Sequence, residues 1–282
     1  MSTAPITLTS LHLYPVKSCA GVAVHEAQLC DTGLDLDRLW MVVDAQGEFV
    51  SQRQAPRLAL VAPSVRHGEV ILRAPGMLAL HLPLDMAGEP LPVRVWDDAV
   101  PAYDMGPVAA QWFADYLGQP GLQLARFDPD HVRLASPRWT GAVQARTAFS
   151  DGFPLLVGSQ ATLDDLNARL AVQDHAPVDW RRFRPNLVID GLPACDEDYV
   201  DTLQFGDVVL RLVKPCPRCP IPNIDPDTAL SSPAVSDTLA GYRSDARVDG
   251  AVTFGMNAIV VHAGSGTLRV GASGQAQWAF KS

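Results

Sequence analysis

The segment at residues 216–228 places the strongest constraint on the fold, because it cannot form a helix. It combines two cysteines, an arginine and two aspartates with several prolines. Proline removes backbone donors and restricts φ, so we expect a stiff loop here. The preceding residues 208–213 have the composition of a strand. A rigid loop that presents thiols at the end of a strand indicates a metal or redox site.

The Cys-x-x-Cys pair formed by Cys216 and Cys219 has four chemical interpretations. Half of a zinc site is disfavoured, because the other cysteines, Cys19, Cys30 and Cys195, are isolated in the sequence. A thioredoxin-like redox pair is disfavoured too, because it should precede a helix and prolines follow this pair. Two interpretations stay open from the residues alone. One thiolate binds a soft, redox-active metal cofactor, or both cysteines pack as small hydrophobic side chains.

Short, evenly spaced strands predict a mainly β fold. Residues 6–14 alternate between apolar and polar, and β-type runs follow at 39–43, 49–52, 58–65, 69–72, 77–82, 92–96, 258–261 and 267–270. Such spacing is typical of a barrel or a sandwich. Two helices are expected within this pattern. The first covers residues 107–117, with Pro107 at its start and Gly118 at its end, and the second covers 160–170 with Ser159 as N-cap.

Length and composition set the wider expectations. A chain of 282 residues suits two domains, and the polar stretch at 127–144 is the best linker, so we expect domains at 1–126 and 127–282. The net charge of −9 gives no electrostatic support for nucleic-acid binding. No signal peptide and no apolar run of membrane-spanning length is visible, which argues against a membrane role. Five cysteines without a visible disulfide pattern favour a reducing, cytoplasmic location.

A series of motifs resembles one known family. Cys-x-Arg-Cys at 216–219, followed by Asp-Pro-Asp-Thr at 225–228, resembles the molybdenum-cofactor loop of MOSC-domain proteins. The resemblance is closest to the mitochondrial amidoxime-reducing component and its bacterial relatives. Further motifs of this family, in the same order, are Tyr-Pro-Val-Lys-Ser (14–18), Asp-Arg-Leu-Trp (37–40), Arg-Gln-Ala-Pro-Arg-Leu (53–58), Phe-Ser-Asp-Gly-Phe-Pro-Leu-Leu (149–156), Phe-Arg-Pro-Asn-Leu-Val (183–188) and Phe-Gly-Met-Asn (254–257).

The resemblance implies a fold and a function. The fold would be α+β but mainly β: a MOSC N-terminal β-barrel-like domain, then a MOSC β-barrel with a few helices. The cofactor would be molybdopterin with molybdenum, bound through the second cysteine of the loop, Cys219. The activity would be reduction of N-hydroxylated compounds such as amidoximes, hydroxylamines or N-hydroxy purines. Because the sequence has no nicotinamide, flavin or iron–sulfur motif, a separate electron-transfer protein is the expected partner of a monomeric chain.

The resemblance also assigns site residues. Lys17, Ser18 and Arg38 suit the cofactor phosphate, because arginine binds phosphate bidentately and lysine adds a point charge. The full set of expected cofactor-binding residues is Lys17, Ser18, Arg38, Asp151, Arg184, Asn186, Arg218 and Cys219.

The expected catalytic residues are Cys219, Asp151 and Asp225. Both aspartates lie in turn-forming sequence, so a purely structural role is the alternative for each. Two other functions stay open for the whole chain. In a cofactor carrier or sulfur-handling MOSC protein, Cys219 would shuttle sulfur rather than hold a metal. A non-enzymatic β-domain interaction protein would need no cofactor.

Overall fold

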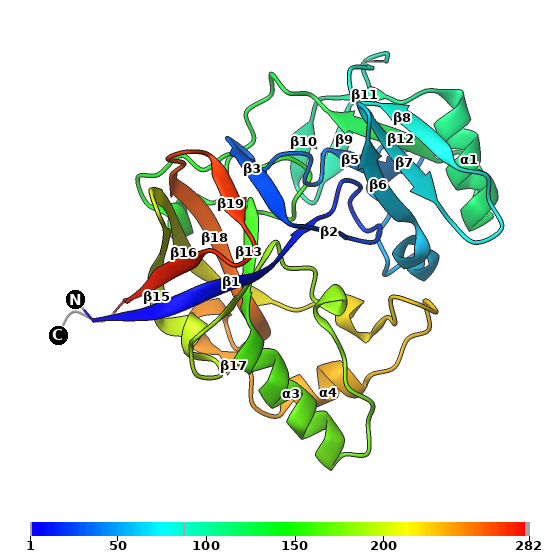
Figure 1. The fold of residues 1–282 in the computed structure, drawn as a ribbon. Helices are drawn as coiled ribbons and strands as arrows, with labels where there is room; N and C mark the ends of the chain where they lie inside the picture. The colour runs from blue at the N-terminus through cyan, green and yellow to red at the C-terminus, as the bar shows by residue number, and fades with distance from the viewer. Residues whose placement is uncertain (1, 87, 280–282) are drawn as a thin grey trace.

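The computed structural model describes residues 2–86 and 88–279, and its larger part is a closed β-barrel (Figure 1). Within the described residues, seven strands form the ring, and the last pairs back with the first. In ring order they are β13 (Leu155–Ser159), β14 (Leu187–Asp190), β1 (Thr3–Leu13), β20 (Ser273–Trp278), β15 (Val200–Phe205), β16 (Val208–Pro217) and β18 (Ala251–His262). Short strands β2 (Val22–Val24) and β17 (Ser244–Asp245) extend β1 and β18.

The sequence of β1 shows how this barrel obtains its core. Ile6 and Leu8 point inward with the two-residue period of a strand, but the next buried residue is Leu11. A register shift between Leu8 and Ser10 against β14 accounts for the extra residue. Such a bulge restores the apolar face to the core, which would otherwise turn to solvent after Leu8.

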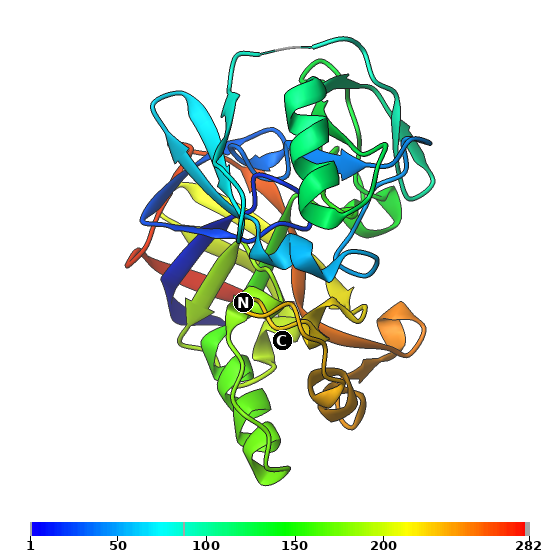
Figure 2. The same cartoon turned by 90° about the vertical axis from the view of Figure 1, so that its right-hand side faces the viewer.

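The rest of the N-terminal half forms smaller sheets, most of them around two further cores, whereas one sheet packs against the barrel core. One sheet contains β11 (Ala102–Asp104), β12 (Gln123–Phe127) and β5 (Trp40–Val43); another contains β6 (Ala62–Arg66), β7 (Glu69–Arg73) and β8 (Leu80–Pro83). A hairpin joins β9 (Val93–Val95) to β10 (Asp98–Val100), and the sheet against the barrel core pairs β3 (Glu26–Cys30) with β4 (Gly33–Leu34) and β19 (Thr267–Arg269). Helix α1 (Pro107–Leu117) lies beside these sheets (Figure 2). It buries Phe113 and Tyr116 in the core that also contains Trp40 and Leu58.

The other helices belong to the barrel half. α3 (Gln160–Val172) and α4 (Ala234–Ala240) pack together at the end of the barrel that lies away from the N-terminal sheets (Figures 1 and 2). The short helices are α2 (Pro137–Thr140), η1 (Pro56–Leu60), η2 (Trp180–Arg182), η3 (Asp196–Tyr199), η4 (Ile221–Asn223) and η5 (Ala246–Val248).

The mainly β fold predicted from the sequence is confirmed, and the differences lie in individual elements. α1 has the expected ends, with Gly118 in the left-handed conformation that ends a helix. α3 begins as expected, but the buried Ser159 hydroxyl makes no capping hydrogen bond and has no partner among the described residues. The strand expected at 49–52 is only an isolated bridge at Phe49, and η1 replaces the start of the strand expected at 58–65.

Among the described residues, no helix has the length and apolar character needed to span a membrane.

Candidate active site

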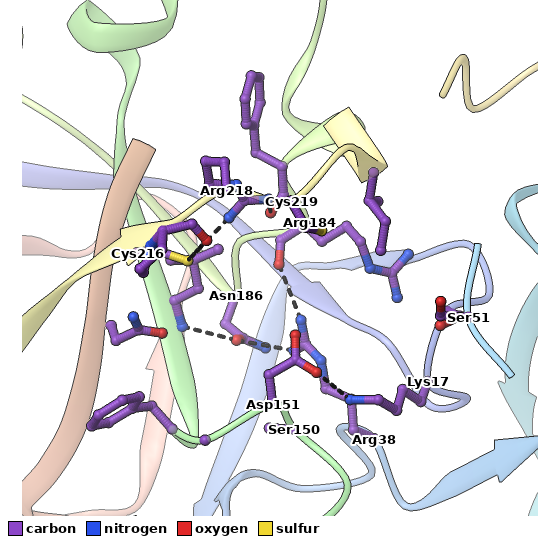
Figure 3. A pocket seen from close by; sticks show the side chains of 18 of the residues that line it. Lys17, Arg38, Ser51, Ser150, Asp151, Arg184, Asn186, Cys216, Arg218 and Cys219 are labelled. Carbon is purple, nitrogen blue, oxygen red and sulfur yellow. Dashed lines mark hydrogen bonds and ion pairs between the residues drawn. The ribbon is translucent and has the colours of Figure 1, made fainter. Parts of the chain in front are cut away.

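A cavity of about 250 Å³ lies where the ends of several barrel strands meet the N-terminal half of the chain (Figure 3). Lys17 and Ser18 follow β1, Arg38 precedes β5, and Asp151 precedes β13. Arg184 and Asn186 lie between η2 and β14, and Arg218 and Cys219 follow β16. The structure therefore brings together all eight of the expected cofactor-binding residues, from segments more than 200 positions apart.

The cavity is strongly cationic although the chain is acidic. Among the described residues, six of the lining side chains are cationic and Asp151 is the one carboxylate. The cationic residues are Lys17, Arg38, Arg53, Arg184, Lys214 and Arg218. A chain with a net charge of −9 that collects cations in one cavity is suited to bind an anion there.

Lys17 and Asp151 form an ion pair in the cavity wall. The Lys17 ammonium donates to Asp151 Oδ1 at 2.5 Å and to the carbonyl oxygen of Phe149 at 2.8 Å. Burial lowers the pKa of Lys17, and Asp151 opposes that shift. Desolvation raises the pKa of Asp151, but the attraction of Lys17 outweighs it and holds the pKa well below its usual range. Asp151 is therefore ionised at neutral pH and holds Lys17 in place.

Two guanidinium groups lie against the buried ring of Tyr14. The guanidinium carbons (Cζ) of Arg38 and Arg184 lie 4.4 and 4.3 Å from the centre of the Tyr14 ring. Arg38 also pairs with the buried carboxylate of Asp37, whereas Arg184 donates to the carbonyl oxygen of Cys19. Burial lowers the pKa of Arg184 to about 10, and the charge of Arg38 acts in the same direction. A bound anion would relieve this repulsion between like charges.

Three of the cavity residues have strained backbone conformations. Ser18, Arg38 and Arg184 have φ values of 68°, 52° and 61°, in the left-handed region. Each such conformation in a residue other than glycine costs on the order of 1–3 kcal/mol and persists only where the surroundings enforce it. The strain indicates that the positions of these side chains are fixed before any ligand binds.

Buried polar side chains hold the cavity segments in place. Asn186 accepts from Arg38 at 3.1 Å and from the backbone N–H of Leu156, and it donates to the carbonyl oxygen of His12. Arg133 donates to the carbonyl oxygens of Ala148, Ser150 and Asp151. These contacts make Asn186 and Arg133 positioning residues for the cavity.

The thiol loop has the expected position but a longer strand before it. β16 continues through Cys216 to Pro217, and one of its register shifts against β18 lies between Pro215 and Pro217, where proline lacks an N–H. Arg218 donates to the Cys216 sulfur at 3.2 Å and to the carbonyl oxygen of Phe183 at 2.9 Å. Its Nε atom is buried and has no partner among the described residues. Cys219 is half-buried, lines the cavity and forms no disulfide.

Asp225 does not belong to this cavity. One of its carboxylate oxygens accepts from the backbone N–H groups of Asp227 and Thr228, and the other accepts from Arg182 at 2.9 Å. Asp225 therefore stabilises its own turn, which was the alternative considered for it. We do not retain Asp225 among the candidate catalytic residues.

Several residues in or around the site were not expected as site residues. Arg53 and Asn257 line the cavity, and both lie within motifs that carried the resemblance. Lys214 also lines the cavity, and the available signal was the rarity of lysine, since the chain has three. Arg133 had no signal, because its partners are mostly backbone carbonyl groups.

The residues present fit a molybdenum–pterin cofactor. Such a cofactor carries an anionic phosphate and a soft metal. The cations of the cavity offer donors for the anionic parts, and so does the buried Nε of Arg218, which has no partner in the described part of the chain. The thiol of Cys219 offers the soft ligand.

Comparison with known proteins gives first the class of this protein. The MOSC N-terminal beta barrel domain matches residues 5–120, and the MOSC domain matches residues 144–273. The chain is a MOSC protein with both domains. The expected boundary after residue 126 lies between the matched ranges and stays a prediction, and β1 at the start of the chain is a strand of the C-terminal barrel.

Within this class, the chain belongs to the family of the mitochondrial amidoxime-reducing components. It is 37% identical over 247 residues to component 1 of Mus musculus, covering 84% of this chain and 71% of that protein. It is 34% identical over 248 residues to component 2 of Rattus norvegicus, covering 84% and 72%. It is also 29% identical over 270 residues to the molybdenum cofactor sulfurase of Homo sapiens, covering 89% of this chain and 30% of that protein.

Proposed function

We propose that this protein is a molybdenum-cofactor-dependent reductase of N-hydroxylated compounds, with Cys219 as the protein ligand of the metal. The observation that carries the proposal is one cavity that combines the Cys219 thiol with six cationic side chains. The names of its relatives, amidoxime-reducing components, support the reductive chemistry.

Different residues of the chain would bind the metal and the anionic end of the cofactor. Cys219 would hold the metal, and Arg38, Arg184 and Lys17 would hold the anionic end of the cofactor. Asp151 stays ionised, so it would keep Lys17 charged and oriented rather than donate a proton from its resting state.

The reaction must balance two electrons and two protons. An amidoxime with two electrons and two protons gives an amidine and water. The bound cofactor supplies the two-electron chemistry that removes oxygen from the N–OH group, and the protein orients cofactor and substrate. No acid other than Asp151 lines the cavity among the described residues, so the wall itself stays cationic during the reaction.

The decisive experiment begins with metal and pterin analysis of the full chain, expressed in a host that makes the cofactor. We expect molybdenum and pterin in equal amounts, and turnover of benzamidoxime with a reduced dye as electron donor. Molybdenum bound without turnover of any N-hydroxylated compound would instead support the cofactor carrier or sulfur-handling function. The likeness to the human molybdenum cofactor sulfurase is the observation that favours this second candidate.

A further inference from the structure

Trp96 occupies a backbone position that normally requires glycine. Strands β9 and β10 pair Val95 with Asp98, so Trp96 and Asp97 form the two-residue turn of the hairpin. Trp96 has a φ of 57°, and Asp97 is not among the residues with positive φ. In two-residue hairpin turns, a positive φ at the first position alone strongly favours glycine. A bulky residue in this conformation is an outlier.

The side chain of Trp96 contacts the cavity edge. Its indole N–H donates to Asp151 Oδ1 at 3.2 Å, beside the Lys17 ion pair. Its ring packs edge-to-face on Phe49, with 5.0 Å between the ring centres. The Arg53 guanidinium lies 4.7 Å from the ring centre. Asp151, Phe49 and Arg53 all line the cavity.

Hydrophobic burial does not explain this arrangement. Trp96 is 45% exposed, so a large part of the indole surface faces solvent. The left-handed conformation costs a residue other than glycine on the order of 1–3 kcal/mol and persists only where the surroundings enforce it. The contacts with Asp151, Phe49 and Arg53 hold the ring at the cavity edge in spite of this cost.

We propose that Trp96 is a substrate-positioning residue that selects N-hydroxylated compounds with a planar aromatic ring. This inference rests on the proposed function and deepens it. The exposed part of the indole offers an aromatic surface beside the cavity, and aromatic pairs gain energy beyond the area they bury. A small substrate such as hydroxylamine has no ring to place there, so its reduction does not depend on Trp96.

The test compares Trp96→Ala and Trp96→Phe with the parent, using benzamidoxime and hydroxylamine as substrates and a reduced dye as donor. For benzamidoxime we expect Trp96→Ala to raise KM about tenfold with little change in kcat, since tenfold corresponds to ~1.4 kcal/mol. Trp96→Phe, which keeps a ring but loses the hydrogen bond to Asp151, restores most of the KM. The kinetic constants for hydroxylamine stay within about twofold in both variants, because this substrate has no aromatic ring for Trp96 to bind.

Two further measurements keep the result interpretable. Metal content and the thermal melting temperature show whether each variant folds and loads the cofactor. Calorimetric titration of the loaded, full-length protein with benzamidoxime, without an electron donor, measures binding apart from turnover. Binding that depends on Trp96 without turnover would remove the proposed function but keep this inference. Equal losses for both substrates, no rescue by phenylalanine, or no binding of benzamidoxime to the parent would overturn it.

Discussion

At the scale of single residues, the two thiols of the loop have different surroundings. Both cysteines line the cavity without a disulfide, and the sulfur of Cys216 accepts a hydrogen bond from Arg218. If Cys219 alone binds the metal, Cys219→Ser should abolish molybdenum retention and activity, and Cys216→Ser should keep most of the metal. Metal analysis of the purified variants checks this. Equal loss in both would indicate a paired cysteine site.

Replacing the two expected phosphate ligands Lys17 and Arg38 should have different effects on stability and on cofactor binding. Lys17→Ala removes a charge whose partner, Asp151, is largely exposed, so we expect the variant to fold. A charged contact contributes ~1.5–3 kcal/mol, so the affinity for the cofactor should fall about tenfold or more. Arg38→Ala leaves the buried Asp37 carboxylate without its ion pair and should cost about 3–5 kcal/mol of stability. Urea unfolding separates the two effects. A Lys17→Ala protein that retains the cofactor as tightly as the parent would exclude Lys17 from binding.

At the scale of elements, a buried carboxyl joins α3 to η3. Glu197 is fully buried and accepts from the Thr162 hydroxyl at 2.7 Å, while Thr162 accepts from the backbone N–H of Cys195. Burial raises the pKa of Glu197 to about 7 from 4.5, and Asp198 adds to the shift while Arg243 opposes it. Between these values the folded state binds more protons than the unfolded state, so this group makes stability fall as pH rises.

Glu197→Gln should therefore be as stable as the parent near pH 4.5 and more stable above pH 7, by on the order of 3 kcal/mol for a shift of this size. The measurement is the free energy of unfolding in urea at both pH values. Glu26→Gln, at an exposed ion pair with Arg269, is the control and should change little at either pH. The prediction is contradicted if the free energy of unfolding of Glu197→Gln changes with pH in the same way as that of the parent.

Elements with local signals were predicted from the sequence, and elements defined by distant partners were not. α1 was predicted to the residue, because Pro107 and Gly118 mark its ends in the sequence itself. β13 and β14 are short, mostly buried runs that have no clear two-residue period, so they were missed. β18 extends well beyond the predicted strand at 258–261, because its first part pairs with β17 and with the end of β16, a strand that is distant in the sequence.

In the candidate site too, residues with a local sequence signal were predicted and residues without one were not. The motifs placed Lys17, Arg38, Arg184 and Cys219 correctly in one cavity, because these motifs resemble those of a family and occur in the same order. Arg133 could not be predicted, since it acts through backbone carbonyl groups that any sequence supplies.

At the scale of the whole molecule, the site depends on both halves of the chain. β1 lies between β14 and β20 in the barrel, although its residues begin the sequence. Lys17 and Ser18 follow directly from this strand, and Cys219 follows β16 in the same barrel. Arg38 and Arg53, which lie outside the ring, complete the lining, so neither matched domain forms the cavity alone.

The source of electrons is the last property that belongs to the whole chain. The sequence contains no Gly-x-Gly-x-x-Gly run that opens a helix after a strand, and Gly264-Ser265-Gly266 lies in the connection between strands β18 and β19. We therefore predict that the purified, cofactor-loaded protein does not use a nicotinamide directly and receives electrons from a separate redox protein. Encounters of this kind bury little area and are weak, so the partner need not copurify.

The assay is benzamidoxime reduction with a nicotinamide alone, then with a reduced dye, then with an added electron-transfer protein and its reductase. We expect no turnover in the first case and turnover in the other two. Raising the salt concentration should slow the reaction with the protein donor and leave the reaction with a neutral dye unchanged, because salt screens attraction between charged surfaces. Full turnover with the nicotinamide alone would show that the chain contains a further cofactor site.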